Sequence, residues 1–290
     1  MMEWIKKIGS CLANGLRFIQ NHFKATLLVL FVLWLILPSS EEGLTSYNLQ
    51  KISLVGPIID ATSIVEQLDE ARENKEVKGV LFSIDSPGGA VAPSVEIAYA
   101  VKRLRETKPV VVYAAGIMAS GGYYSAIWGS EIVANPGSMI GSIGVIMEGA
   151  DLSELMAKVG VKTQVVHAGT YKQVGTMERQ WSNVERAELE KIINGTYTLF
   201  VGDVARARKL DLNRSNDYAD AHVFTAAQAK EVKLVDSLGV EFDAKKRLEA
   251  LTKVTDPTWN KEDPMDKFFK KFAAEGATLA HMYFPPVTLK

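Results

Sequence analysis

Runs of apolar and β-branched residues alternate with stretches of helical periodicity through the middle of the chain. The apolar runs predict strands over residues 50–56, 78–85, 109–115, 131–134, 142–147 and 162–167. The helical stretches predict helices over residues 63–74, 91–106, 123–128, 182 to about 210, a short segment from 225, and 242–251. The run 78–85 is continuously apolar, which is typical of a strand covered on both faces. This alternation predicts an α/β layered fold with largely parallel strands.

Three capping-box patterns support the predicted helix starts. They are Ser63-x-x-Glu66, Ser182-x-x-Glu185 and Thr225-x-x-Gln228. In such a box the first side chain and the fourth each satisfy a free backbone N–H group of the opening turn. We therefore expect helices to begin at these three places.

The first 40 residues have a different pattern. Residues 1–24 have apolar side chains at helical spacing with lysine and arginine between them, which predicts an amphipathic helix. Residues 25–38 form an uncharged apolar run, shorter than the ~20 residues of a typical membrane-spanning helix. Such a run also fits the core of a signal peptide, but Leu37-Pro38-Ser39-Ser40 matches a cleavage site poorly. We therefore favour a retained transmembrane signal-anchor over residues 25–40.

Charge predicts how this anchor is oriented. Basic residues precede the apolar run, and Glu41 and Glu42 follow it. Because basic residues stay on the cytoplasmic side, the remainder of the chain is expected on the non-cytoplasmic side of the membrane. A buried core helix, the alternative interpretation of the run, fits poorly with so asymmetric a charge pattern.

The chain is thus predicted to have four parts. These are a cytoplasmic amphipathic segment (1–24), an anchor (25–40), a main domain (41–252) and a C-terminal tail (253–290). In the tail, residues 265–283 are amphipathic, with phenylalanines set against lysines. We favour packing of this helix on the domain or on a neighbouring subunit over contact with a membrane surface.

Composition excludes several classes of site. The formal net charge of the 290-residue chain is −1, so no basic surface for nucleic acid is expected. The one cysteine, Cys11, precedes the apolar run, and the four histidines lack zinc-ligand spacing. We therefore expect no metal and no cofactor, and a catalytic apparatus that does not depend on cysteine or on a histidine cluster.

A serine marks the junction between two predicted elements. Ser120 lies between the strand at 109–115 and the helix at 123–128, where free N–H groups and the helix dipole stabilise an anion. Gly121 and Gly122 leave room for the backbone of a substrate. An ordinary glycine-rich turn is the alternative interpretation of this stretch.

A second glycine-bearing turn follows the neighbouring buried strand. Ser86-Pro87-Gly88-Gly89 ends the strand at 78–85. Two such turns at adjacent strand ends can direct backbone N–H groups at one point, which is how an oxyanion hole is built. Alone, this motif is also compatible with a simple connection between a strand and a helix.

A nucleophilic serine needs a base, and the sequence offers few. His22 precedes the apolar run and His281 is in the tail, which leaves His167 and His222. The remaining possibility is Lys172, in a turn after an apolar stretch. A lysine acts as a base only when its amine is uncharged, which burial in an apolar pocket favours. On spacing alone, a solvated surface lysine is the commoner case.

Four motifs in order produce a family resemblance. They are Ser86-Pro87-Gly88-Gly89, Met118-Ala119-Ser120-Gly121-Gly122-Tyr123-Tyr124, Gly141-Ser142-Ile143-Gly144-Val145 and Gly169-Thr170-Tyr171-Lys172. Over residues 50–251 the chain resembles the short, one-domain form of bacterial signal peptide peptidase A. These are membrane-anchored serine–lysine peptidases with a ClpP/crotonase-like fold of repeated β-β-α units.

The resemblance implies a role for each motif. It implies Ser120 as nucleophile, Lys172 as general base, and Ser142 as the hydroxyl that orients the lysine amine. It implies an oxyanion hole formed by the N–H groups of Gly89 and Gly121. It also implies a homo-oligomeric ring or dome at the bacterial inner membrane, with cleaved signal peptides and other apolar peptides as substrates.

The chain departs from the family pattern in one stretch. Ala221-His222 replaces the usual Gly-Arg, and Ala226 replaces a frequent glycine, which affects assembly or pocket shape more than the dyad. Two alternatives remain open at this point. One is a crotonase-type acyl-thioester enzyme, which uses paired N–H groups without a Ser/Lys pair. The other is a non-catalytic membrane-associated scaffold of the same fold.

Overall fold

The computed structural model describes residues 47–260, together with positions 23, 24, 27, 28 and 31. The chain divides into two compact units, Met1–Ser46 and Tyr47–Lys290. In the first unit, the described residues Phe23, Leu27, Leu28 and Phe31 are helical and exposed. The rest of the predicted amphipathic segment and anchor, and the predicted helix at 265–283, lie outside the described residues. Among the helices that are described, none has the length and apolar character needed to cross a membrane.

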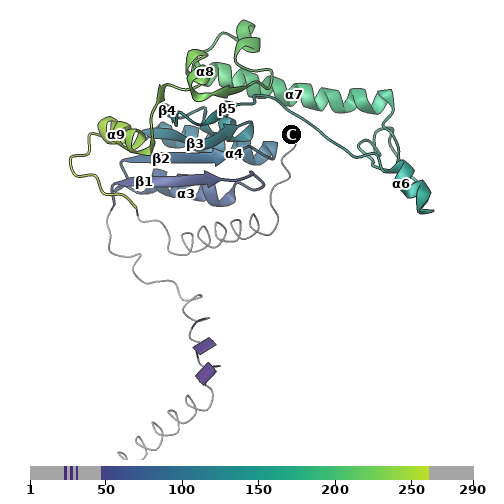
Figure 1. The fold of residues 1–290 in the computed structure, drawn as a ribbon, viewed down its shortest axis with the longest axis horizontal. Helices are drawn as coiled ribbons and strands as arrows, with labels where there is room; N and C mark the ends of the chain where they lie inside the picture. Colours follow the sequence, from purple (N-terminus) through teal and green to yellow (C-terminus); the bar gives the residue numbers. More distant parts are fainter. Residues whose placement is uncertain (1–22, 25–26, 29–30, 32–46, 261–290) are drawn as a thin grey trace, which may run out of the picture. The chain divides into compact units, whose positions relative to one another are not determined.

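A parallel sheet forms the centre of the second unit (Figure 1). Its main strands lie in the order β1 (Leu49–Val55), β2 (Gly79–Ser86), β3 (Val110–Ala119), β4 (Glu131–Ala134) and β7 (Ser237–Leu238). β5 (Met139–Gly141) pairs in parallel with the end of β3, and β6 (Val223–Thr225) pairs with β5 in antiparallel orientation. The predicted α/β fold with largely parallel pairing is confirmed.

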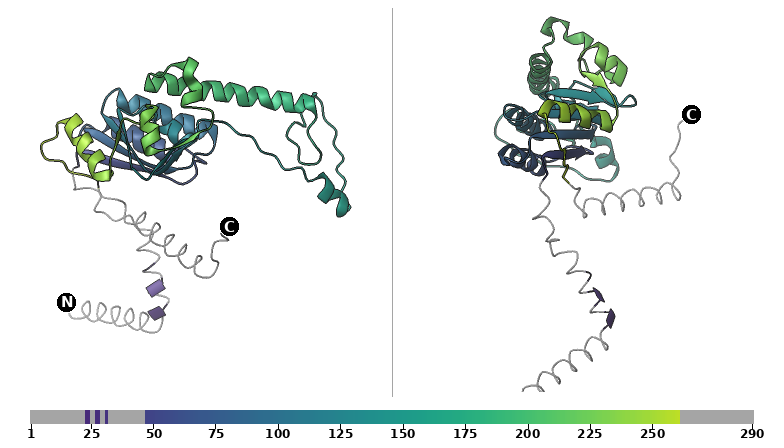
Figure 2. Two further views of the ribbon diagram at one scale, coloured as in Figure 1. Left: turned by 45° about the horizontal axis from the view of Figure 1, so that its top comes forward. Right: turned by 90° about the vertical axis from the view of Figure 1, so that its left-hand side faces the viewer.

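Helices cover both faces of this sheet (Figure 2). On one face, α3 (Thr62–Glu73), α4 (Val91–Arg105) and α5 (Gly121–Ala126) pack against a core that includes Val80, Phe82 and Ile84. On the other face, α9 (Glu241–Thr252) packs on Leu81 and its neighbours. Successive strand residues point to opposite faces, so a strand buried on both faces is apolar at consecutive positions, as β2 is over 80–82.

A bulge in β3 redirects the strand toward the candidate site. The pairing register between β2 and β3 shifts between Ile84 and Ser86 of β2. The extra residues at this shift belong to β3 and include Gly116. The Asp85 carboxylate accepts a hydrogen bond from the Ile117 N–H group (2.8 Å), which holds the bulge. Before the bulge β3 pairs with β4, and after it β3 pairs with β5. The bulge therefore lets β3 extend to Ala119, beyond the predicted end at 115.

Between β5 and α7 (Asn183–Arg208) the chain forms an extension that we call the arm, residues 145–182. It carries the short helix α6 (Ser153–Lys158), and Figure 1 shows it reaching out from the sheet beside the first half of α7. After α7 come the 3₁₀ helix η2 (Leu212–Asp217) and α8 (Ala226–Glu231). Exposed apolar residues are frequent on the arm, among them Val161, Val165 and Val166.

Several predicted elements need correction. The strand predicted at 142–147 is instead β5 at 139–141, and 162–167 forms no strand. The latter segment lies in the exposed arm, where no described strand edge is available to pair with its β-branched residues. Single strands alternate with helices up to α5, and two strands then follow in succession at β4 and β5. Within residues 47–260 this is one β-β succession, not the predicted repeat of β-β-α units.

The capping boxes also differ in outcome. Those at Ser182 and Thr225 are present, with both hydrogen bonds formed. The box predicted at Ser63 and Glu66 is wrong, because α3 begins one residue earlier. There the Asp60 carboxylate accepts hydrogen bonds from the Thr62 N–H and hydroxyl groups (2.9 and 3.1 Å). A stronger local acceptor upstream thus displaces the helix start.

Ala221 offers a simple test of backbone strain next to the site. Its φ is 57°, a left-handed conformation that costs an alanine about 1 kcal/mol relative to glycine. We expect Ala221→Gly to raise the melting temperature by a few degrees, about 2–4 °C for a domain of this size. Ala221→Val should lower it, because a β-branched side chain tolerates this conformation poorly. Thermal melts of both variants at one scan rate provide the check. A lower melting temperature for Ala221→Gly than for the wild type would contradict the backbone strain inferred at Ala221.

Candidate active site

Ser120 occupies a strained turn between β3 and α5. Its φ of 51° and ψ of −123° lie outside the regions that most residues adopt. The turn is held on both sides: the Ser120 N–H group donates to the Gly141 carbonyl (2.8 Å), and the Ser120 carbonyl accepts from the Tyr124 N–H group (2.9 Å). Such strain, about 1–3 kcal/mol, persists only where the surroundings fix it, and it is frequent at catalytic positions. A serine on a sharp strand-to-helix turn presents its hydroxyl in the same way as a nucleophile elbow.

The two glycine-bearing turns meet beside this serine, as the sequence predicts. A Cβ atom on Gly88 would lie 2.6 Å from the Gly121 nitrogen and 2.9 Å from the Ser120 Cβ atom. A Cβ atom on Gly121 would lie 3.3 Å from the Gly89 nitrogen. The turns therefore pack backbone to backbone, which only glycine permits at this distance.

The N–H groups of these turns are available to a ligand. Ile58 pairs with the peptide groups on either side of Gly89 and leaves the Gly89 N–H group without a partner among the described residues. Gly121 is the first residue of α5, where an N–H group has no partner within the helix. Gly89 and Gly121 thus present two donors near Ser120, the arrangement that an oxyanion requires.

Ser142 lies next to Ser120 across the β3–β5 ladder. Ala119 pairs with Gly141, so the serines that follow them stand side by side at the carboxyl ends of two parallel strands. Ser142 also has a positive φ, 50°, and its N–H group donates to the His222 carbonyl (2.7 Å). The structure therefore brings together four of the five predicted site residues: Ser120, Ser142, Gly89 and Gly121.

Lys172 is the exception. It lies on the arm, its side chain is exposed, and it does not line the pocket at Ser120. Its N–H group closes a turn with the Gly169 carbonyl (3.2 Å), but its amine has no hydrogen bond or ion pair within residues 47–260. Within one copy, the described residues 47–260 thus do not enclose this amine in apolar surroundings.

Neither candidate histidine replaces it. His167 also lies on the arm, where its Nδ1 atom is 3.2 Å from the Gly169 carbonyl oxygen. His222 is exposed, with its ring 6.0 Å from the ring of Phe224. Neither residue lines the pocket at Ser120. In the part of the chain that the structure describes, Ser120 has no imidazole partner.

An apolar pocket opens beside Ser120. Its volume is ≈ 100 Å³, and its walls come from three places: Val91 and Val95 on α4, Val145 at the start of the arm, and Leu199 and Phe200 on α7. Tyr124 forms part of the lining and meets the ring of Phe200 edge to face, with centroids 4.8 Å apart. A cavity of this kind accepts an apolar side chain.

A buried carboxylate lies behind this pocket. The Tyr124 hydroxyl donates to Asp203, which is fully buried and also pairs with Arg206. Burial and the hydrogen bond to Asp203 raise the pKa of Tyr124 far above its usual value. Tyr124 therefore stays neutral and separates the charge of Asp203 from the pocket. Neither this pair nor the contribution of α7 to the pocket was predicted from the sequence, although the apolar positions of that helix were a signal for it.

The glycine turn allows a sharp test. A Cβ atom on Gly89 would lie 2.1 Å from the Ile58 carbonyl oxygen, so Gly89→Ala must displace the turn. We expect it to lower kcat for peptide hydrolysis by about 10²–10³-fold, the usual cost of losing one oxyanion donor. Gly137→Ala is the matched control, since its nearest neighbour would be 3.5 Å away. Normal turnover in Gly89→Ala, with the protein folded, would argue against this oxyanion hole.

Comparison with known proteins identifies the family of the chain. The model of peptidase family S49 matches residues 102–255, and a Clp protease model matches residues 45–140. "Putative protease MJ0651" of Methanocaldococcus jannaschii is 41% identical over 68% of this chain and 64% of its own length. "Putative protease slr0021" of Synechocystis is 38% identical over 69% of this chain and 73% of its own length.

A third relative carries the name that the motifs predict. "Putative signal peptide peptidase SppA" of Enterococcus faecium is 32% identical over 75% of this chain and 67% of its own length. The predicted resemblance to signal peptide peptidase A is thereby confirmed. With the family model matched over more than half of its residues, this chain belongs to peptidase family S49, the serine proteases that include the signal peptide peptidase A proteins.

Proposed function

We propose that the chain is a membrane-anchored serine endopeptidase that degrades apolar peptides, chiefly remnant signal peptides, outside the cytoplasm. Ser120 is its nucleophile and Lys172 its general base. The observation that carries the proposal is the strained Ser120 turn, packed against the Gly88–Gly89 turn beside an apolar pocket. Such a turn costs stability, and a catalytic hydroxyl is the clearest reason for keeping it.

The proposed reaction gives each of these groups one role. The neutral Lys172 amine takes the proton of the Ser120 hydroxyl, and the Ser120 oxygen attacks the scissile carbonyl carbon. The N–H groups of Gly89 and Gly121 bind the resulting oxyanion, and Ser142 orients the amine. The lysine ammonium then protonates the leaving amine, and water hydrolyses the acyl-enzyme by the same route.

The position of Lys172 adds a requirement. Because the arm places this amine in solvent within one copy, we propose that Lys172 of one copy acts on Ser120 of a neighbouring copy. The exposed apolar residues of the arm support this, since they would be buried between copies. Burial there would remove water from the amine and favour its uncharged form. The active unit is then a closed homo-oligomer.

The pocket supports the class of substrate. Its lining is apolar, and Tyr124 shields it from the charge of Asp203. An apolar side chain next to the scissile bond fits these walls, and it helps to keep water from the lysine amine. The apolar run at 25–38 and its flanking charges support an anchor with the catalytic unit on the non-cytoplasmic side.

A labelling experiment tests the proposal. The full-length protein in detergent is treated with a fluorophosphonate, which phosphonylates activated serine hydroxyl groups with loss of fluoride, and the labelled peptide is mapped by mass spectrometry. The expected result is modification of Ser120, with parallel loss of hydrolysis of an apolar peptide. A crotonase-type enzyme would turn over acyl-thioesters and remain unlabelled. A scaffold would show neither labelling nor turnover, and either outcome would refute the proposed function.

A further inference from the structure

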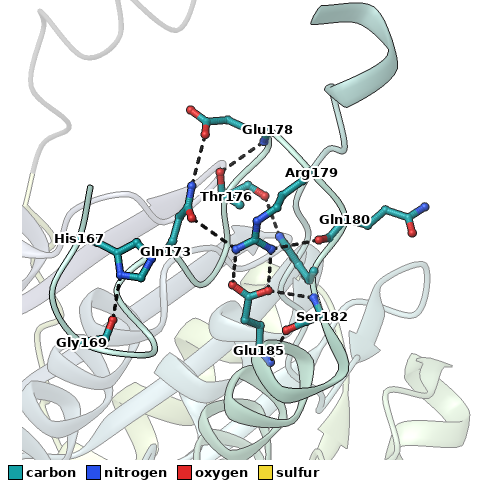
Figure 3. Close-up of polar contacts among 10 residues, drawn as sticks. His167, Gly169, Gln173, Thr176, Glu178, Arg179, Gln180, Ser182 and Glu185 are labelled. Atoms are coloured by element: carbon teal, nitrogen blue, oxygen red, sulfur yellow. Dashed lines mark hydrogen bonds and ion pairs between the residues drawn. The ribbon is translucent and has the colours of Figure 1, made fainter. Parts of the chain in front are cut away.

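A cluster of polar contacts joins Gln173 and Arg179 of the arm to Glu185 at the start of α7 (Figure 3). The Arg179 guanidinium donates two parallel hydrogen bonds to the Glu185 carboxylate, each 2.8 Å long. The same carboxylate accepts the Ser182 N–H group (2.8 Å). Bidentate pairs of this kind fix direction as well as distance. Arg179 therefore ties the arm to the first turn of α7 in one geometry.

The α7 end of this pair is a buried carboxylate on a long helix. Glu185 lies in the first turn of the helix, and its side chain is only 8% exposed. Its pKa is lowered to about 2, first by Arg179 and then by the Ser182 N–H group, so it is ionised at neutral pH. Further along α7, Phe200, Val201 and Val204 are buried in the main core. The carboxylate is therefore carried on a helix whose second half is anchored in the core.

The arm end of this pair leads to Lys172. The Arg179 guanidinium also donates to the side-chain oxygen of Gln173 (3.4 Å), the residue after Lys172. Within the same stretch of the arm, the Trp181 indole N–H group donates to the Thr176 carbonyl oxygen (2.8 Å). The stretch from Lys172 to Ser182 is thus a closed loop whose base is fastened to α7.

From this arrangement we infer that Arg179 and Glu185 are positioning residues for the catalytic lysine: they hold the loop 172–181 at the angle from which Lys172 reaches its serine. The inference rests on the proposed role of Lys172. Neither residue touches substrate. Their effect is on the placement of the amine, and a displacement of about 1 Å at a reacting group can lower turnover by about 10²-fold.

Two conservative substitutions test the pair. Glu185→Gln keeps an acceptor for the Ser182 N–H group, because glutamine also serves in capping boxes, but it loses the ion pair with Arg179. Arg179→Lys keeps the charge and loses the bidentate geometry. We expect each to lower kcat by about tenfold or more while KM stays within about twofold of wild type.

Two controls separate positioning from stability. Ser182→Ala removes the hydroxyl cap from the same helix end without touching the ion pair, and Lys191→Ala breaks an exposed pair with Glu188 further along α7. Both should keep a wild-type kcat. Hydrogen–deuterium exchange adds a readout that is independent of activity: peptides covering 169–178 should exchange faster in Glu185→Gln and Arg179→Lys, but not in Lys191→Ala.

The outcomes are distinguishable. If Lys172→Ala retains full activity in the same assay, the proposed function fails, and this inference fails with it. If Lys172→Ala is inactive but Glu185→Gln keeps a normal kcat, only the positioning role is refuted. If peptides covering 169–178 exchange hydrogen at the wild-type rate in Glu185→Gln, the ion pair does not hold the loop to α7, and the inference is refuted. An equal loss of kcat in Ser182→Ala would assign the effect to helix stability instead.

Discussion

Ser120→Ala is expected to lower kcat for hydrolysis of an apolar peptide by about 10⁴-fold or more, because the variant has no oxygen to form the acyl-enzyme. The backbone of the turn should survive, since its hydrogen bonds to Gly141 and Tyr124 use main-chain atoms alone. Binding should survive as well, because the pocket walls on α4 and α7 are unchanged.

Steady-state kinetics together with direct peptide binding measure both expectations. Ser215→Ala is the matched control, since the Ser215 hydroxyl makes no hydrogen bond within residues 47–260. Turnover above a few per cent of wild type in purified Ser120→Ala would show that another group attacks the substrate.

Lys172→Ala is expected to lower kcat by about 10³-fold or more, near the upper range for loss of a general base. Lys172→Arg should be equally impaired, because arginine keeps the positive charge but does not give up its proton in proteins. This pair of variants separates a role as base from a role in an ion pair.

The control for this prediction lies on the same arm. Lys158 is exposed on α6, and Lys158→Ala should hydrolyse the peptide at the wild-type rate. Full activity in Lys172→Arg would mean that the cation, and not an uncharged amine, is what the site needs.

Much of the fold was predictable because its strands are buried on both faces. The run at 78–85 is apolar at most of its inner positions, so its sequence indicates a central parallel strand directly. The turns at Ser120 and Gly89 were predictable for a related reason. Glycines at the carboxyl ends of adjacent strands indicate that the backbones of the two turns approach each other closely, and in the structure they do.

The arm was not predictable from local pattern. Residues 162–167 have the β-branched composition of a strand, yet they are exposed and unpaired in one copy. The composition of a segment indicates that it can form a strand. Whether it does so depends on a neighbouring strand from elsewhere in the molecule. The same limit applies to Lys172, whose position relative to Ser120 depends on elements far from both in sequence.

The extent of β3 and the pair Tyr124–Asp203 also depend on distant contacts. The Ile117 N–H group in the bulge requires Asp85, 32 positions away, and the Tyr124 hydroxyl requires Asp203, 79 positions away. In the sequence each of these residues has a simpler local interpretation: a turn aspartate after a strand, and an acidic residue in a long helix. Only the packed structure joins them.

The central claim is that Ser120 of one copy is activated by Lys172 of another, and co-expression of the two inactive variants tests it most directly. Copies of Ser120→Ala and Lys172→Ala with different tags are purified together by two affinity steps. In randomly mixed rings about one quarter of the sites would combine an intact serine with an intact lysine, so hydrolysis should recover to about one quarter of wild type. Activity no higher than that of either variant alone would contradict the shared site.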